Sequence, residues 1–285
     1  MPQSLTEIRE LLQSRGLAPR KALGQNFLID HNLVRKLVDA SGIQAGDVVL
    51  EVGPGTGTLS LELLHRGARL TACELDRGLA ELLRETIAPQ FPETFTLIEG
   101  DCLASPRELA PELASALGGA SGVTGETSTP PFTLVANLPY GAATPLMLIL
   151  LTRYPACRGM YVTIQREVGD RLLGEPGNKD YGPLGVIVQA MARVRKVATL
   201  PPECFWPRPD VTSVMIGVER LESPLVEQAR AAAFLDFCQL AFSQRRKQLG
   251  SVLGRSRAWP AGIEPTMRAE QLTAAELLAL WNAGT

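Results

Sequence analysis

The sequence contains few of the side chains that bind metals or cross-link small folds. Among its 285 residues are only two histidines, His31 and His65, and five cysteines, which are scattered with no C-x-x-C pair. Zinc sites need closely spaced Cys and His ligands, and disulfide frameworks need recurring Cys spacings. The sequence therefore predicts no metal site and no disulfide framework, and it fits a reducing compartment.

Long apolar runs are also missing, and we expect no secretory leader. No apolar segment reaches the roughly 20 residues that cross a bilayer, and residues 1–4 do not begin a signal-peptide core. We therefore expect a soluble, cytoplasmic protein with no membrane partner. Hydrophobic residues make up 45% of the chain, which is enough for a large core in one big domain or two ordinary ones.

Net charge is small, −2, but its distribution is uneven. Residues 1–150 hold 11 Lys and Arg against 17 Asp and Glu, whereas residues 151–285 hold 17 against 13. An excess of positive charge in one half hints at contact with a polyanion such as a nucleic acid.

The central feature is an apolar run, Val48–Leu50, that leads into the acid Glu51 and then into three alternating glycines, Gly53, Gly55 and Gly57. The run predicts a strand buried on both faces, and a helix is expected from Thr58 to Leu64. This spacing lacks the third glycine position of a dinucleotide loop and the Gly-Lys-Ser/Thr of a phosphate loop. The form E-x-G-x-G-x-G instead resembles the cofactor loop of S-adenosylmethionine-dependent methyltransferases.

Acidic residues follow the next two predicted strands. The strand over residues 68–73 ends at Glu74, where a carboxylate can accept hydrogen bonds from both hydroxyls of a ribose. The strand over residues 95–98 leads to Asp101, which can accept from an adenine amino group. An acid at one strand end is often a helix cap, but two beside a glycine loop favour a ligand pocket.

The tip of the fourth predicted strand, residues 132–136, carries Asn137-Leu138-Pro139-Tyr140. An adenine N6 is a poor nucleophile because its lone pair is delocalised into the ring. The Asn137 side-chain oxygen and the Leu138 carbonyl could accept from that amino group and favour attack on a sulfonium methyl. Pro139 stiffens the turn, and Tyr140 offers a ring on which the base can stack.

The remaining segments complete an α/β pattern. Residues 158–164 predict a fifth strand, and residues 193–197 and 211–218 predict an antiparallel hairpin at the sheet edge. Residues 105–117 suggest a short helix. Residues 118–131, rich in Gly, Ser, Thr and Pro, are expected to form a flexible surface excursion.

The last part of the chain loses the strand pattern. Residues 225–253 and 269–283 have helical periodicity, which predicts a small helical domain. Arg245, Arg246 and Lys247 form a basic cluster within it. A solvated helix face explains such a cluster as well as phosphate contact does; the charge asymmetry favours phosphate contact.

Taken together, the chain closely resembles the KsgA (RsmA) family of small-subunit ribosomal RNA adenine-N6 dimethyltransferases. The resemblance covers nearly all of the chain from Lys21 onward. The motifs that carry it are Gly24–Leu28, Glu51–Gly55, Glu74–Asp76, Gly100–Asp101, Asn137–Tyr140 with Thr144–Leu146, Gln165–Val168, Phe205 with Pro207–Pro209, Ala241–Lys247 and Met267–Glu270. The sequence departs from the family's pattern after Tyr140, where Gly141-Ala142-Ala143 replaces the usual Asn-Ile-Ser.

The resemblance implies a Rossmann-like class I methyltransferase domain over residues 21–222, after a lead-in over residues 1–20. A C-terminal all-helical domain that contacts RNA or the ribosome would span residues 223–285. It implies S-adenosylmethionine as the cofactor and N6,N6-dimethylation of two adjacent adenosines near the 3′ end of small-subunit (16S) rRNA within the immature 30S subunit, by a monomer.

The same resemblance implies roles for single residues. Six are expected at the cofactor or its pocket: Asn26, Leu28, Gly53, Glu74, Asp101 and Asn137. The target base would be held by Asn137, Leu138 and Tyr140 around Pro139, and Phe205 would stack on the other face of the base.

Three other classes share part of this pattern. Large-subunit rRNA adenine methyltransferases of macrolide resistance have a similar Asn-Leu-Pro-Tyr motif, but the segments at 244–247 and 267–270 favour the small-subunit family. DNA adenine methyltransferases more typically have Asp/Asn-Pro-Pro-Tyr, so Leu138 argues against them. A non-catalytic ribosome-assembly or transcription factor could dispense with the cofactor, and the joint presence of the glycine loop, Glu74, Asp101 and Asn137 argues against it.

Overall fold

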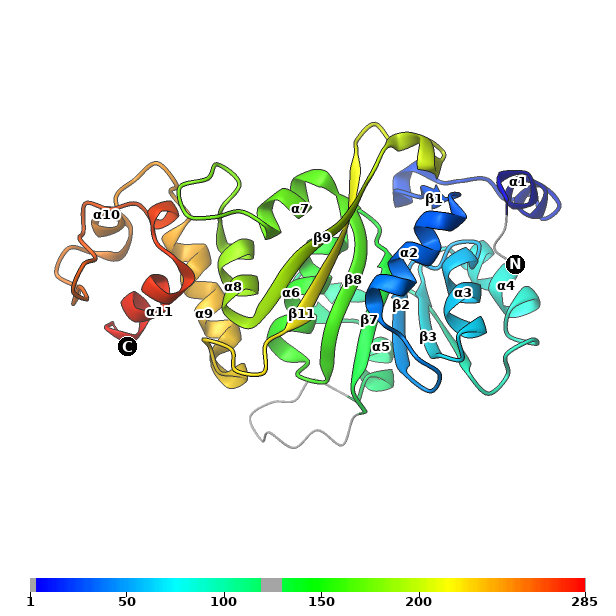
Figure 1. Cartoon of the computed structure of the whole chain (residues 1–285), viewed down its shortest axis with the longest axis horizontal. Helices are drawn as coiled ribbons and strands as arrows, with labels where there is room; N and C mark the ends of the chain where they lie inside the picture. Colours follow the sequence, from blue (N-terminus) through cyan, green and yellow to red (C-terminus); the bar gives the residue numbers. More distant parts are fainter. Residues whose placement is uncertain (1–3, 119–129, 285) are drawn as a thin grey trace.

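The computed structural model describes residues 4–118 and 130–284 and has a seven-stranded sheet at its centre (Figure 1). The strand order is β4-β3-β2-β7-β8-β11-β9. Five strands are parallel neighbours: β2 (Val48–Val52), β3 (Arg69–Glu74), β4 (Phe95–Glu99), β7 (Phe132–Asn137) and β8 (Cys157–Gln165). The late hairpin is confirmed, because β11 (Ser213–Arg220) is antiparallel to both β8 and the edge strand β9 (Ala192–Leu200).

Alternation along the strands builds two separate cores, one on each face of the sheet. Adjacent residues on one strand point to opposite faces, so Val49 and Leu50 belong to different clusters, as do Val135 and Leu134. A strand that is apolar at successive positions is therefore buried on both sides, as the run Val48–Leu50 predicted.

Helices cover both faces. One face packs against α1 (Leu5–Gln13), α2 (His31–Ser41), α3 (Thr58–His65) and α4 (Arg77–Thr86). The other face packs against α5 (Pro111–Ala116), α6 (Ala143–Arg153), α7 (Arg166–Leu172) and α8 (Pro183–Met191). In Figure 1, α2 and α3 lie in front of the sheet and α6 lies behind it.

The C-terminal helices extend the second core. They are α9 (Gln228–Ala241), α10 (Leu249–Leu253), the short 3-10 helix η3 (Ala269–Gln271) and α11 (Ala274–Asn282), and they occupy the end of the molecule away from α3 and α4 (Figure 1). Phe234 of α9 and Leu277 of α11 are fully buried in the same cluster as Leu146 of α6 and Val186 of α8. The α/β fold with a helical C-terminal part is thus as predicted.

Two predicted segments differ from the structure. Residues 105–117 were expected to be one helix, but β5 (Leu103–Ser105) and β6 (Glu108–Leu109) form a small hairpin before α5. The helical run predicted over 225–253 is interrupted, because α9 ends at Ala241 and turns occupy residues 242–247 before α10. The basic cluster therefore lies on a turn and not on a helix. Most of the predicted surface excursion, residues 119–129, lies outside the described residues.

Within the part of the chain that the structure describes, no helix combines the length and the apolar composition that crossing a bilayer requires.

Arg220, at the end of β11, joins three elements of the second core. Its Nη2 donates to the carbonyl oxygens of Leu151 at 2.9 Å and of Leu150 and Tyr154 at 3.3 Å, at the end of α6. Its Nε donates to the Cys157 carbonyl at 3.0 Å. Nη1 donates to Gln228 Oε1 of α9 at 2.8 Å. One guanidinium thus adds further donors to the carbonyls at the C-terminal end of α6 and anchors the first C-terminal helix.

We expect Arg220→Met to destabilise the fold by about 2–4 kcal/mol, because five hydrogen bonds from one guanidinium to partly buried oxygens are lost at once. Urea unfolding measures the change. Arg193→Met on the exposed edge strand is the matched control and should shift stability by less than about 0.5 kcal/mol. Equal unfolding midpoints for the two variants would contradict this role of Arg220.

Candidate active site

A cavity of about 500 Å³ lies at the carboxyl ends of β2, β3, β4 and β7. Its wall also includes residues 21–28, which contain the 3-10 helix η1 (Lys21–Leu23) and strand β1 (Phe27–Leu28). The cavity gathers nine of the residues predicted from the sequence: Asn26, Leu28, Gly53, Glu74, Asp101, Asn137, Leu138, Pro139 and Tyr140. Segments more than 100 residues apart in the chain thus meet at one edge of the sheet.

The glycine loop forms the floor of this cavity. Gly53, Gly55 and Gly57 all have left-handed φ angles, of 73°, 61° and 87°. A Cβ on Gly55 would lie 2.9 Å from the Phe27 ring, and one on Gly57 would lie 2.3 Å from Ile87 Cδ1. Both backbone conformation and close packing therefore require glycine here.

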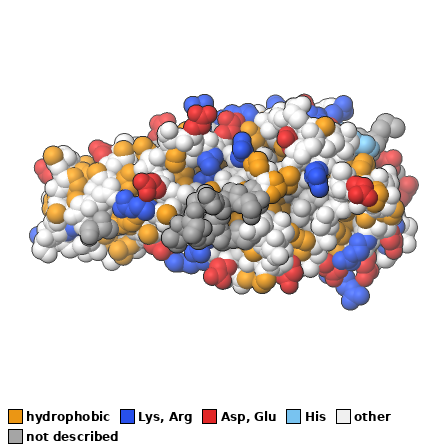
Figure 2. All heavy atoms as spheres, turned by 90° about the horizontal axis from the view of Figure 1, so that it is seen from below, with side chains coloured by type: hydrophobic (Ala, Val, Ile, Leu, Met, Phe, Trp, Pro, Cys, Tyr) orange, Lys and Arg blue, Asp and Glu red, His pale blue; other side chains and the backbone are white. Residues whose placement is uncertain are grey.

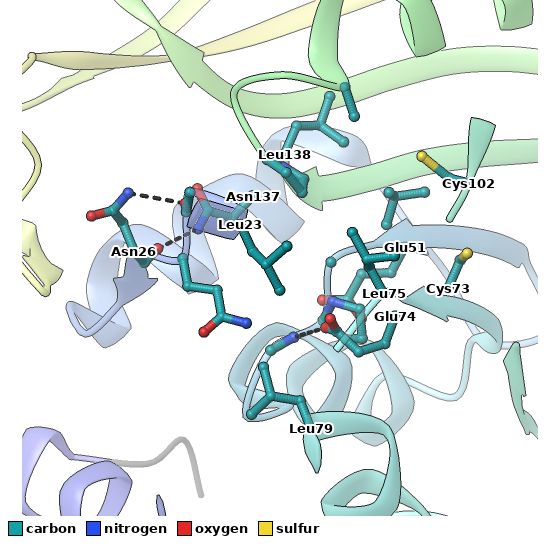
Figure 3. A pocket seen from close by; sticks show the side chains of 18 of the residues that line it. Leu23, Asn26, Glu51, Cys73, Glu74, Leu75, Leu79, Cys102, Asn137 and Leu138 are labelled. Carbon is teal, nitrogen blue, oxygen red and sulfur yellow. Dashed lines mark hydrogen bonds between the residues drawn. The ribbon is translucent and has the colours of Figure 1, made fainter. Parts of the chain in front are cut away.

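Glu74 holds the glycine loop against the tip of β3 (Figure 3). Its Oε2 accepts from the Gly55 N–H at 3.0 Å, and its Oε1 accepts from the Asp76 N–H at 2.8 Å. The side chain is only 5% exposed, and burial raises the pKa of its carboxyl, an effect that the two backbone hydrogen bonds oppose. Each carboxylate oxygen keeps a second lone pair for a ligand hydroxyl.

Asp76 fastens the N-terminal wall to the same strand tip. Its Oδ1 caps α4 by accepting from Gly78 N at 2.9 Å. Its Oδ2 accepts from Gln25 Nε2 at 3.0 Å and lies 3.3 Å from Arg20 Nε. The wall continues into β1, which pairs with β10 (Phe205–Trp206) in a two-residue ladder.

Asn137 faces this wall from the end of β7. Its Nδ2 donates to the Asn26 carbonyl at 3.0 Å (Figure 3). Because a carbonyl oxygen can only accept, the contact fixes which branch of the amide carries nitrogen and leaves Oδ1 as the acceptor on the other branch. Asn26 is fixed in turn, since its own Nδ2 donates to the Gly24 carbonyl at 3.0 Å.

The turn after Asn137 packs closely on the glycine loop. The Pro139 ring leaves no room for a side chain at Gly53, where a Cβ would lie 3.0 Å from Pro139 Cγ. Leu138 is buried, and its N–H donates to the Thr163 carbonyl at 3.1 Å. The Tyr140 hydroxyl lies 3.3 Å from Ser213 Oγ at the start of β11. These contacts fix the turn between two neighbouring strands.

Apolar and neutral groups line the side of the cavity near Asp101. Asp101 is exposed, and its Oδ1 accepts from the Leu103 N–H at 2.9 Å. Cys73 and Cys102 are buried, and burial raises the pKa of each thiol to about 12, so neither is a thiolate nucleophile at neutral pH. Leu75 lines the cavity and is 51% exposed, which suits apolar contact with a planar ring. The sequence reasoning missed Leu75, because a lone Leu after an acid carries no pattern.

The predicted residues outside the cavity lie in two places. Phe205 is 3% exposed, pairs with Leu28 in the β1–β10 ladder, and does not line the cavity. In the basic turn (Arg245, Arg246 and Lys247), Arg245 is committed to other contacts. Its Nε lies 2.6 Å from Glu270 Oε2, and its Nη2 donates to the Asn178 carbonyl at 2.9 Å. Arg246 and Lys247 are exposed.

Among the described residues, 4–118 and 130–284, no group of three or more His, Cys, Asp or Glu side chains is placed to hold a metal ion.

Glu51 is a second buried acid that lines the cavity, and the sequence analysis gave it no role. Its side chain is 1% exposed and accepts from Ser60 Oγ of α3 at 2.6 Å. Burial raises the pKa of its carboxyl to about 8; the nearby Glu74 carboxylate adds to the increase, and the Ser60 hydrogen bond opposes it. Glu51 is therefore mostly protonated at neutral pH.

This burial predicts a pH-dependent difference in stability between the parent protein and Glu51→Gln. The unfolded chain loses the Glu51 proton near pH 4.5, whereas the folded protein keeps it to about pH 8. Between these values the folded state binds more protons, so parental stability relative to Glu51→Gln falls as pH rises, by at most about 1.4 kcal/mol per pH unit, and then levels off.

Denaturant unfolding from pH 4.5 to 9 tests this expectation. The exposed Glu93→Gln is the control, whose difference from the parent should not vary across the same range. Parallel pH profiles for parent and Glu51→Gln would show that Glu51 is ionised in the folded protein.

Comparison with known proteins agrees with this geometry. Proteins described as ribosomal RNA small subunit methyltransferase A are 40% identical in Leifsonia xyli and 38% identical in Mycobacterium bovis. Each alignment covers 96% of this chain, with 95% and 86% of the respective relative. A relative of the same description in Magnetococcus marinus is 40% identical, with 96% and 95% covered.

Solved structures give the same fold at lower identity. A dimethyladenosine transferase from Plasmodium falciparum matches with a TM-score of 0.68 and 20% identity, covering 88% of this chain and 94% of that one. The 23S rRNA methyltransferase ErmE matches with a TM-score of 0.64 and 22% identity, covering 91% and 99%. At this identity the two structures establish a Rossmann-like methyltransferase fold. Residues 16–284 match the family described as ribosomal RNA adenine dimethylase, and the chain therefore belongs to that family.

Proposed function

We propose that this chain uses S-adenosylmethionine to dimethylate N6 of two adjacent adenosines near the 3′ end of small-subunit rRNA. It acts as a cytoplasmic monomer on the immature 30S subunit. Support comes from family membership together with one geometric observation: the Asn137 side-chain oxygen is held at the edge of a cavity whose other groups suit the cofactor.

The cavity fits S-adenosylmethionine in size and charge. Its volume of about 500 Å³ falls in the range of small-molecule sites. The ionisable residues that line it are three acids, Glu51, Glu74 and Asp101, and one base, Lys21; because the Glu51 carboxyl is mostly protonated, Glu74 and Asp101 are the acids that can carry negative charge. An acidic cavity suits a ligand with a positively charged sulfur and ammonium group. Glu74 would accept from the ribose, Asp101 from the adenine amino group, and Leu75 would contact the adenine face.

The chemistry needs positioning more than acid–base help. When bound, S-adenosylmethionine supplies a methyl group that is already activated by its positive sulfur. Asn137 Oδ1 and the Leu138 carbonyl accept from the adenine amino group and favour the pyramidal nitrogen whose lone pair can attack. The contact of Asn137 with Asn26 holds that acceptor in place before the base arrives.

Two aromatic residues are proposed to hold the base. Tyr140 lines the cavity and offers a stacking surface, and Ser213 restrains its hydroxyl. Phe205 is proposed to stack on the opposite face. Because its ring is now 3% exposed, this contact requires a shift of the β1–β10 ladder.

Transfer of a tritiated methyl group tests the function directly. Purified protein is incubated with immature small subunits or with large subunits, and the labelled nucleosides are identified. We expect N6,N6-dimethyladenosine from small subunits only. Label in large subunits, or on another base, would refute the proposed substrate.

Asn137→Ala should lower the methyl-transfer rate at least ~100-fold, the scale of losing one preorganised polar contact to a transition state. Single-turnover rates at saturating cofactor give the change, and binding to small subunits should stay near parental. The exposed Asn32→Ala is a control for losing an amide elsewhere. A near-parental rate for Asn137→Ala would rule out this activation of N6.

RNA contact is proposed for the C-terminal region, residues 223–285, through the basic turn. On the face shown in Figure 2, Lys and Arg side chains are interspersed with Asp and Glu. Because the described residues on this face form no broad basic surface, phosphate contact is proposed at one defined basic cluster. Arg246 and Lys247 are the exposed members of the basic turn, whereas Arg245 holds Glu270 and Asn178. We therefore divide the roles: Arg246 and Lys247 contact phosphates, and Arg245 fixes the turn from which they project.

Replacing Arg246 and Lys247 by Gln should flatten the log–log salt dependence of small-subunit binding by roughly 1–2 units, because each phosphate contact releases counterions. Arg245→Gln should chiefly lower stability, since it leaves Glu270 unpaired. Affinity across a salt series and urea unfolding separate the two effects. Equal salt slopes for the double variant and the parent would show that Arg246 and Lys247 do not contact RNA phosphates.

A further inference from the structure

A second hollow, of about 380 Å³, opens beside the active site and is not used by the mechanism above. It lies between the end of β8, the residues just before β11 and the loop that follows α7. We call it the flanking groove. The residues that matter for its chemistry are Gln165, Arg166, Lys179, Val211 and Thr212.

The groove adjoins the active site at one end. Gln165 pairs with Ser213 in the β8–β11 ladder, and Ser213 Oγ lies 3.3 Å from the hydroxyl of Tyr140. Thr212 immediately precedes Ser213, and its carbonyl accepts from the Arg166 N–H at 3.0 Å. A base held against Tyr140 therefore has its nearest neighbours in the RNA close to this end.

The groove adjoins the basic turn at the other end. Arg245 donates to the Asn178 carbonyl at 2.9 Å, and the Gly177 N–H donates to the Glu270 carbonyl at 2.7 Å. These contacts hold the loop that carries Lys179 against the basic turn. Lys179 is thus one residue from a contact with Arg245, which precedes the exposed Arg246.

Most charged side chains that line the groove are already paired, and one lysine is left for an RNA phosphate. Arg166 lies 3.4 Å from Asp170, and Glu167 forms an ion pair with Arg171, so most of the lining is neutralised. Asp180 is the remaining acid. Lys179 is exposed and forms no ion pair among the described residues, so its ammonium group can contact a phosphate.

The groove also offers surfaces for a base. Val211 is 41% exposed there, which gives a base an apolar contact. Gln165 and Thr212 have side chains that both donate and accept hydrogen bonds, as base edges and ribose hydroxyls require.

We infer that the flanking groove binds the single-stranded nucleotides next to the target adenosine, with their backbone at Lys179 and a base at Val211. The inference rests on the proposed function, because it needs an RNA whose adenosine enters the cavity. It gives the substrate a continuous path from the basic turn to Tyr140. When an adenosine leaves a stacked RNA strand to enter the cavity, the nucleotides beside it are also unstacked. A surface with a cation for the backbone and an apolar contact for a base can hold those nucleotides.

The first test compares Lys179→Gln with Lys36→Gln. Lys36 is an exposed lysine on α2, which packs on the opposite face of the sheet. Lys179→Gln should raise the KM for immature small subunits, leave kcat and S-adenosylmethionine affinity unchanged, and lower the salt slope by about 0.9, one phosphate contact. Lys36→Gln should match the parent. A parental KM and slope for Lys179→Gln would overturn the backbone contact.

The second test maps the occupant of the groove. Val211→p-benzoylphenylalanine is irradiated with immature small subunits, and crosslinked nucleotides are located by primer extension. We expect crosslinks within about two nucleotides of the methylated adenosines. Crosslinks only to distant rRNA or to ribosomal protein, from a variant that still methylates, would overturn the groove assignment and leave the proposed function standing. Failure of the parent protein to methylate immature small subunits would instead refute the proposed function.

Discussion

The cavity depends on one buried carboxylate. Glu74 accepts backbone hydrogen bonds from Gly55 of the glycine loop and from Asp76, the residue that caps α4. The tips of β2 and β3 are thereby held at a fixed separation. Without such an acceptor, the N–H of Gly55 would be buried unpaired, because its loop packs directly on Phe27. Glu74 keeps the loop in shape and still has lone pairs for a ligand, so this wall of the cavity is formed by contacts within the protein itself.

The other wall depends on a chain of polar contacts that begins at the neighbouring Asp76. That residue caps α4, holds Gln25 and lies beside Arg20, and the segment it fixes then presents the Asn26 carbonyl to Asn137. Orientation of the Asn137 amide therefore depends on residues more than 100 positions earlier in the chain. Such a network costs little to maintain where every member is paired, and leaving one member unpaired is expensive.

Much of this arrangement could be predicted from sequence because it follows from short-range rules. A run that is apolar at every position must be buried on both faces, and Gly53 needs a φ that other residues avoid. Acids at successive strand ends must converge when the strands are parallel. These rules located β2, Glu74, Asp101 and Asn137 without knowledge of the fold.

The differences arise where long-range contacts decide. The β5–β6 hairpin is short, and its residues lack the alternation that marks a strand. No Pro marks the end of α9 in the sequence, so the pattern predicted helix through the turns that carry Arg245. Neither the pairing of Arg245 with Glu270 nor the burial of Phe205 beside Leu28 has a local signal, because each partner lies elsewhere in the chain. The charge pattern found the basic turn but could not tell which of its members is already paired.

The two-residue ladder between β1 and β10 has a consequence for engineering the enzyme. One strand belongs to the wall that surrounds the cofactor, and the other carries the aromatic residue proposed for the substrate base. Because four residues share this ladder, neither strand can be displaced alone. A substitution that shifts Phe27 or Leu28 to widen the cavity will therefore also shift Phe205, so if Phe205 stacks on the base as proposed, donor selectivity and base selectivity are coupled through this ladder.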